Sequence, residues 1–212
     1  MTDDAQESAW HPEAITSSTE QTLHDLSISS LGDFYLAGGT GLALQFGHRI
    51  SEDLDFFTKD LFDEDALIQR VQRTPGFSLV AKARSTVHTN IRQTKVSFWG
   101  YDYPVLFPLA RFLEVRIADA RDIACMKISA IASRGTKRDF VDLYASARLW
   151  DLAELLRLFN QKYTQSAYKK IHILKSLTFF EDAEKDPMPH LLTPVDWGEV
   201  RRFFLRQTPH FS

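Results

Sequence analysis

The sequence contains a single cysteine, Cys125, among 212 residues. One thiol allows no disulfide within the chain and no cysteine-based zinc site, so stability has to come from a packed core. Cys125 lies in an apolar helical segment, and we expect its side chain in that core. The low cysteine content is typical of a protein in a reducing compartment.

An excess of basic residues and a long apolar run are also missing. The chain has 25 Lys and Arg against 28 Asp and Glu, a formal net charge of -3, so any polyanion would need a local site. The longest stretch free of charge and histidine runs from Phe34 to Gly47, which is shorter than the roughly 18 residues of a membrane helix. The N-terminus begins Met-Thr-Asp-Asp, unlike a signal peptide. We expect a cytoplasmic protein without membrane contact.

The composition that remains is that of a globular protein. Apolar residues make up 44% and charged residues 25%, which excludes a disordered or collagen-like chain. The length is typical of one domain with a helical extension. We expect a flexible N-terminal arm over residues 1–18, a core over 19–150, and a helical region over 151–212 packed on that core.

Hydrophobic periodicity predicts an α/β (α+β) fold, with a mixed, partly antiparallel sheet flanked by helices. Thr40 is expected to cap the helix after a Gly38-Gly39 turn. The expected strands cover 34–37, 53–58 and several segments of 77–117, including 112–117. The expected helices cover 19–30, 40–45, 63–71, 119–133, 140–150, 152–160, 167–180 and 195–205.

Two aspartates in the second expected strand are the first sign of chemistry. Asp53 and Asp55 are two positions apart, so both side chains point to one face of the strand. Two close carboxylates repel each other unless a cation bridges them, and hard oxygen ligands of this kind suit Mg²⁺ together with substrate phosphates. Either this pair or a glycine turn could be purely structural. Their combination on neighbouring strands predicts a site for metal and phosphate.

The glycine turn supplies the complementary half of this site. Gly38, Gly39 and Thr40 precede a helix, and bare backbone N–H groups at a helix N-terminus accept phosphate oxygens. Because glycine has no Cβ, a phosphate can approach the backbone closely. These three residues are therefore candidates for nucleotide binding.

A second constellation lies on the two helices after residue 119. Lys127 sits on or beside an apolar stripe, and Asp139 and Asp142 share one face of the following helix. Two interpretations are open. The residues could form a buried structural ion pair. Alternatively, Lys127 contacts a triphosphate, Asp142 assists the acceptor hydroxyl or orients Lys127, and Asp139 supports them.

Two segments, from Leu36 to Phe57 and from Asp122 to Tyr144, resemble the motifs of the AbiEii/AbiGii toxin family of nucleotidyltransferases. That family belongs to the polymerase-β-like superfamily. The resemblance implies a nucleotidyltransferase-type sheet and metal-dependent transfer of a nucleoside monophosphate from an NTP, with Mg²⁺ or Mn²⁺. It also implies RNA, and tRNA in particular, as acceptor, a role as the toxin of a toxin-antitoxin or abortive-infection system, and an antitoxin partner.

Two residues before the acidic pair, Arg49 and Ser51, fall on polar positions of the same motif. Arg49 and Ser51 could reach a phosphate or base, or could belong to a solvent-facing loop. His48 is expected to be a loop residue and not a metal ligand. Two short basic pairs, Lys169-Lys170 and Arg201-Arg202, are interpreted as solvated helix faces.

One feature of the superfamily has no clear equivalent in this chain. Many relatives carry a third carboxylate on a later strand, but the segment Thr94–Trp99 contains none. Glu114 is the nearest candidate, although a pair with Arg116 or a solvated face is the preferred explanation. The site could thus hold one metal, or Asp139 and Asp142 could take over the role. Two other functions stay open: a degenerate nucleotide- or RNA-binding module, and transfer to a protein or small molecule.

Overall fold

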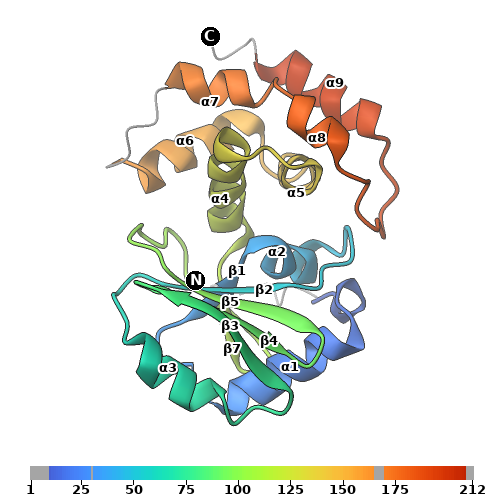
Figure 1. The fold of residues 1–212 in the computed structure, drawn as a ribbon. Helices are drawn as coiled ribbons and strands as arrows, with labels where there is room; N and C mark the ends of the chain where they lie inside the picture. The colour runs from blue at the N-terminus through green and yellow to red at the C-terminus, as the bar shows by residue number, and fades with distance from the viewer. Residues whose placement is uncertain (1–9, 30, 165–169, 209–212) are drawn as a thin grey trace, which may run out of the picture.

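The computed structural model describes residues 10–29, 31–164 and 170–208. One sheet forms the lower half of the molecule in Figure 1, with α1 and α3 on one of its faces and α2 and the later helices on the other. The strands are β1 (Tyr35–Ala37), β2 (Leu54–Thr58), β3 (Phe77–Ala83), β4 (Thr86–Ile91), β5 (Thr94–Gly100), β6 (Ala110–Phe112) and β7 (Val115–Ile117). The helices are η1 (Pro12–Ala14), α1 (Ser17–Ile28), α2 (Gly38–Phe46), α3 (Glu64–Val71), α4 (Ala120–Ser133), α5 (Lys137–Ser146), α6 (Leu152–Lys162), α7 (Lys170–Ser176), α8 (Glu181–Lys185) and α9 (Trp197–Gln207).

The sheet is mixed, which confirms the predicted fold class. Its strand order is β3-β4-β5-β2-β1-β7-β6, with β2 parallel to β5 and β1 parallel to β7, while the other neighbouring pairs are antiparallel. The antiparallel register of β1 and β2 pairs Ala37 with Asp55. This pairing brings the start of α2 next to the acidic pair, as the sequence predicted.

Successive side chains of β2 point alternately into the hydrophobic core and toward the opposite face of the sheet. Leu54 and Phe56 are fully buried in the cluster formed with α1 and α3. Because side chains alternate across a strand, Asp55 and Phe57 face the opposite side of the sheet. That side carries the cleft described below.

The C-terminal helices form a second hydrophobic cluster. It joins Ile128 of α4, Leu143 of α5, Leu155 of α6 and Phe204 of α9. The predicted boundary at residue 150 falls inside this packed unit, because α4 and α5 bury their apolar faces against the later helices and not only against the sheet. Of the helices in the part of the chain that the structure describes, none is long and apolar enough to cross a membrane.

The predicted flexible arm falls partly outside the described residues, namely over residues 1–9. The rest of it contacts the core: Ala14 is fully buried, and the backbone N–H of Ser51 donates to the Ala14 carbonyl at 2.8 Å. Ile15 forms a parallel bridge with Ser51. Residues 10–16 therefore help to hold the loop that precedes the acidic pair.

Several predicted boundaries need correction. Thr40 does not cap α2, which begins at Gly38 after Ala37 and has no side-chain cap. Residues 112–117 are not one strand but parts of β6 and β7. Helix α5 begins at Lys137, because Thr136 caps it, and ends at Ser146. Helix α8 was not predicted, and residues 167–169 of the expected helix 167–180 lie outside the described residues.

Candidate active site

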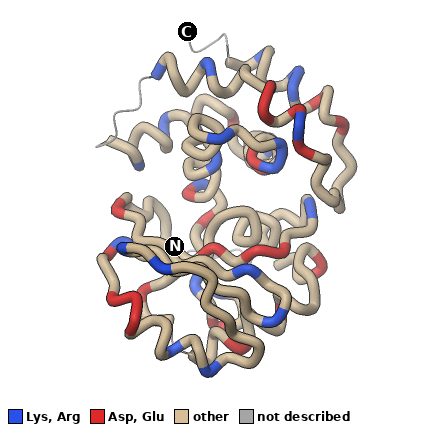
Figure 2. The backbone as a smooth tube through the Cα atoms, in the orientation of Figure 1, with Lys and Arg blue, Asp and Glu red and all other residues tan. Residues whose placement is uncertain are grey.

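A cleft of about 640 Å³ lies between the sheet and helices α4 and α5. Its sheet side is formed by the first glycines of α2, the two aspartates and residues of β5, and its helical side by α4, the turn after it and the start of α5. The residues that matter below are Gly38, Gly39, Asp53, Asp55, Lys95, Ser97, Trp99, Lys127, Arg134, Arg138 and Asp139. Basic and acidic residues are interspersed over both halves of the molecule in Figure 2. The charges that act in the cleft are therefore those of its own lining residues.

The acidic pair lies in this cleft, at and just before the start of β2. Burial raises the pKa of Asp55, and the nearby charge of Asp53 adds to the effect, although Trp99 and Lys127 act in the opposite direction. The indole Nε1 of Trp99 lies 3.5 Å from Oδ1 of Asp55. A desolvated carboxylate beside a second carboxylate is the electrostatic situation that a divalent cation relieves.

The carboxylate oxygens of Asp53 and Asp55 are suitable ligands for Mg²⁺, but they would fill only part of its coordination shell. Across the described residues, no group of three or more His, Cys, Asp or Glu side chains could hold a metal ion. Mg²⁺ usually keeps waters and binds one or two carboxylates plus substrate phosphates. Asp53 and Asp55 at the wall of an open cleft match that mode of binding.

The two glycines provide close backbone approach at the same wall. Gly38 has a φ of 63°, which favours glycine, and a Cβ there would lie 3.0 Å from Oδ2 of Asp55. A Cβ on Gly39 would collide with the guanidinium of Arg49 and lie 3.3 Å from Oγ of Ser51. The first two residues of α2 therefore have no side chain, and their backbone lies directly against Asp55 and Arg49 at the cleft wall.

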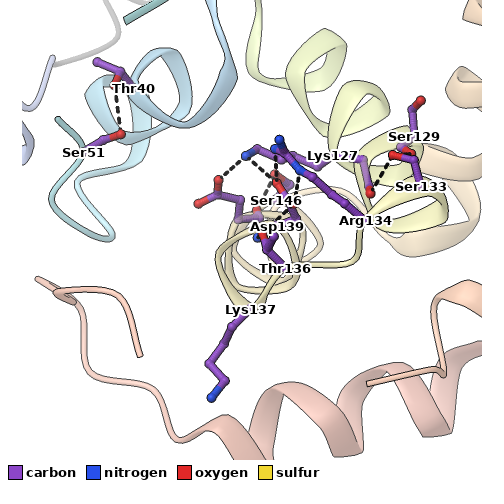
Figure 3. A network of polar contacts seen from close by, with 12 residues as sticks. Thr40, Ser51, Lys127, Ser129, Ser133, Arg134, Thr136, Lys137, Asp139 and Ser146 are labelled. Carbon is purple, nitrogen blue, oxygen red and sulfur yellow. Dashed lines mark hydrogen bonds and ion pairs between the residues drawn. The ribbon is translucent and has the colours of Figure 1, made fainter. Parts of the chain in front are cut away.

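Thr40 connects helix α2 to the loop before β2 through hydrogen bonds of its hydroxyl group. Its hydroxyl lies 2.8 Å from Oγ of Ser51 and also contacts the carbonyl oxygen of Asp53. The Thr40 side chain is 1% exposed and does not line the cleft. As Figure 3 shows, Thr40 and Ser51 link α2 to the loop before β2, which fixes the position of Asp53.

The predicted ion pair is part of a larger buried network, here called the ion cluster: His48, Arg49, Lys127, Asp139 and Asp142. The ammonium of Lys127 lies 3.0 Å from Asp139 and 2.7 Å from Asp142. Arg49 binds Asp142 through Nε at 2.6 Å and through its terminal nitrogen at 2.9 Å. Nε2 of His48 lies 2.8 Å from Asp142. The carboxylate of Asp142 therefore contacts three side chains, those of His48, Arg49 and Lys127.

The ion cluster is charged. Burial would raise the pKa of Asp142, but the charges of Arg49 and Lys127 and the contact with His48 hold it well below the usual range. For Asp139, burial is likewise outweighed, by Lys127 and Arg134, which lower its pKa to about 2. Burial disfavours the Lys127 ammonium, yet Asp142 and Asp139 raise its pKa. Both carboxylates are therefore ionised at neutral pH.

The members of the ion cluster differ in their access to the cleft. Lys127 and Asp139 line it, while Asp142 is fully buried and does not. Arg49 also lines the cleft but is only 3% exposed, so the alternative of a solvent-facing loop was wrong. His48 lies in the loop between α2 and β2, as predicted, and is buried against Asp142.

Glu114 is not a third carboxylate of this site. It occupies the two-residue turn between β6 and β7 with a φ of 62°, and it pairs with Arg111 at 3.2 Å instead of Arg116. The position opposite Asp55 on the neighbouring strand β5 is Ser97. Cys125 is fully buried in the helical cluster, as expected.

Sequence reasoning missed the cations that complete the cleft. Arg134, which falls between the expected helices 119–133 and 140–150, lines the cleft and lies 3.1 Å from Asp139. Figure 3 shows Arg134, Lys127 and Asp139 converging, while Lys137 points away from them. Arg138 and Lys95 line the cleft from α5 and β5. Their roles depend on which elements meet in space, and no local pattern indicates them.

The depressed pKa of Asp139 predicts a loss of stability in acid. The pKa of Asp139 is about 2 in the folded protein, against an ordinary value of 3.8. At any pH above 3.8 its ionised carboxylate therefore stabilises the folded state. That contribution, roughly 2 kcal/mol, is lost as the pH falls from about 4 to about 2. We expect the free energy of unfolding, measured by urea denaturation across this range, to fall more steeply than in Asp139→Asn. Parallel curves for the two proteins would contradict the assignment.

Comparison with solved structures identifies the class of fold. JHP933 from Helicobacter pylori superimposes with a TM-score of 0.56 at 20% identity, over 95% of this chain and 92% of that chain. MenT4, a nucleotidyltransferase toxin from Mycobacterium tuberculosis H37Rv, superimposes with a TM-score of 0.53 at 17% identity, over 91% and 86%. The chain therefore has a nucleotidyltransferase fold.

The sequence comparison is more specific. The family described as nucleotidyl transferase AbiEii toxin, type IV TA system, matches residues 23–107 and 73–212. The chain belongs to this family, and it is a nucleotidyltransferase of the toxin type. It is also 38% identical over 192 residues to an uncharacterised protein of Aquifex aeolicus (strain VF5), covering 88% of this chain and 91% of that protein.

Proposed function

We propose that this protein transfers a nucleoside monophosphate from an NTP to RNA in a reaction that depends on Mg²⁺, with Mn²⁺ as an alternative ion. One observation carries the proposal: the two glycines at the N-terminus of α2 lie directly against Asp55 and Arg49, in a cleft that also contains Asp53 and Lys127. Backbone donors, paired carboxylates and a cation are what phosphoryl-type transfer requires, because its catalysis is mostly positioning and charge neutralisation.

In this proposal the cleft residues have separate tasks. Asp53 and Asp55 would hold the metal ion, which when bound neutralises phosphate charge and activates the phosphorus for attack. The N–H groups of Gly38 and Gly39 bind phosphate oxygens at the positive end of α2. Lys127 adds a point charge to the same triphosphate.

The ion cluster positions these groups. Asp142 is fully buried and held by Arg49, Lys127 and His48, so we assign it to orienting Lys127 instead of contacting the acceptor hydroxyl. Asp139 supports Lys127 and Arg134. Arg49 and Ser51 belong to the nucleotide-binding wall, where the Arg49 guanidinium lies against Gly39.

The acceptor and partner follow from the family and not from the cleft. The family description places its members in type IV toxin-antitoxin systems, which supports growth arrest as outcome and an antitoxin protein as partner. The choice of tRNA or another RNA as acceptor rests on the motif resemblance alone. Arg134, Arg138 and Lys95 line the cleft and supply positive charge for an RNA backbone. A cytoplasmic location stays a prediction.

The test is incubation of the purified protein with each α-³²P-labelled NTP, Mg²⁺ and total RNA, followed by a gel. We expect a labelled product with one NTP, no product in EDTA, and loss of the product after ribonuclease treatment. A product that resists ribonuclease would redirect the proposal to a protein or small-molecule acceptor.

A binding module without turnover is the second candidate. The observation in its favour is that none of the described Glu or Asp residues joins Asp53 and Asp55 in a group that could hold a metal. This candidate predicts saturable NTP binding by calorimetry and no labelled product with any NTP. The gel assay therefore separates the two functions directly.

A further inference from the structure

Three neighbouring strands place polar side chains in one row on the cleft face of the sheet. Asp55 of β2 is the register partner of Ser97 of β5, and Ser97 is the register partner of His88 of β4. Directly paired residues of adjacent strands point to the same face. The row therefore runs from the candidate metal ligand through Ser97, which lines the cleft, to His88.

The contacts within the row connect its members. Nδ1 of His88 lies 3.1 Å from Oγ of Ser97. The His88 ring packs edge-on against Trp99, with ring centroids 4.8 Å apart at 77°. Trp99 in turn places its Nε1 3.5 Å from Asp55. One tryptophan thus touches both ends of the row and fixes the orientation of the imidazole.

The carboxylates of the cleft are poor candidates for accepting the acceptor's proton. Asp53 and Asp55 are committed to the metal ion in the proposed function. Asp142 is buried among three partners, and Asp139 contacts Lys127, Arg134 and Thr136. A carboxylate stabilised by several cations is a weak base. A proton acceptor has to come from elsewhere on the cleft wall.

Resting on the proposed function, we propose that Ser97 and His88 form the proton-accepting pair of the transfer reaction. The acceptor oxygen bonds to the α-phosphorus, and the bond from that phosphorus to the bridging oxygen breaks, its electron pair leaving with pyrophosphate. The acceptor proton passes to Oγ of Ser97 as the Ser97 hydroxyl proton passes to Nδ1 of His88. Ser97 contacts the reacting hydroxyl, and His88 is a positioning residue that acts through it.

Few ionisable side chains share the face of the sheet on which His88 lies. On β5 the nearest ionisable side chain of the same face is Lys95, two positions from Ser97, and on β2 it is Asp55. On β3 the residue opposite His88 is Ala81. The imidazole must be unprotonated to accept, so transfer is expected to decline toward acid pH.

The test compares three variants in the labelled-NTP assay. His88→Gln and Ser97→Ala are each expected to lower the transfer rate about a hundredfold, and their double variant to fall no further, because both remove one relay. NTP binding by calorimetry and the melting temperature should stay at the unaltered values. His24→Gln is the matched control: this exposed histidine belongs to α1, which packs on the opposite face of the sheet, and we expect full activity.

The pH profile separates a relay from a merely structural role. The unaltered protein should lose activity as the imidazole protonates, and His88→Gln should lack that acid limb. Transfer that His88→Gln leaves unchanged would overturn this inference alone, and so would an unchanged acid limb. No transfer by the unaltered protein with any NTP would overturn the proposed function, and this inference with it.

Discussion

Replacing Asp53 and Asp55 together by asparagine is expected to lower nucleoside monophosphate transfer about a thousandfold or more. The amides keep the shape of the side chains but lose the two charges that would hold a divalent cation in the cleft. The measurement is the initial rate of label transfer from α-³²P-NTP in Mg²⁺. Calorimetry with Mg²⁺ and NTP should show weaker binding in the same variant.

The fold of this double variant is expected to stay intact. Burial and the neighbouring carboxylate raise the pKa of Asp55, which means that its charge is unfavourable in the folded protein without a cation. The melting temperature should therefore be unchanged or higher. Asp60→Asn, an exposed aspartate just beyond β2, is the matched control for activity. Undiminished transfer by the Asp53/Asp55 variant would refute the assignment of the metal ligands.

Asp142→Asn is expected to lower the free energy of unfolding by about 3 kcal/mol, which is the cost of breaking a buried ion pair by removing one partner. Asp142 is fully buried, and its charge offsets those of Arg49 and Lys127. The amide removes the carboxylate that both cations contact directly and leaves Lys127 with Asp139 as its remaining ion-pair partner. Urea denaturation at pH 7 measures the change.

An exposed ion pair provides the control for this variant. Asp65 lies 2.7 Å from Lys82, but the side chains are 69% and 46% exposed, so Asp65→Asn should cause no measurable change. Equal denaturation midpoints for Asp142→Asn and the unaltered protein would show that the ion cluster contributes no net stability. In that case Asp142 could not be the residue that fixes Lys127.

Local patterns in the chain were sufficient for much of this fold. The period of two in 53–58 predicted that Asp53 and Asp55 share one face, and both line the cleft, while Leu54 and Phe56 between and beyond them are buried. The spacing of Asp139 and Asp142 on a helix put both beside Lys127. Each of these inferences needs only the geometry of one element or of two consecutive elements.

Long-range pairing accounts for what local patterns could not indicate. Alternation suggested one strand through Glu114, but the chain turns there, with Leu113 and Glu114 both in the left-handed region. Thr40 looked like a helix cap, yet its hydroxyl is used by Ser51 and Asp53 across a loop. Neither difference could be anticipated without the neighbouring chain segment in place.

The sequence was sufficient to bring Gly38, Gly39, Asp53 and Asp55 together at one cleft, because a strand, a glycine turn and a helix close together in the chain have few possible arrangements. The register between strands was not contained in any motif, since hydrogen bonding between β2, β5 and β4 joins segments far apart along the chain. That register put Ser97 beside Asp55 and His88 beside Ser97. The contacts of Asp142 with Arg49 and His48 likewise became visible only after folding, because both residues approach it from the loop between α2 and β2.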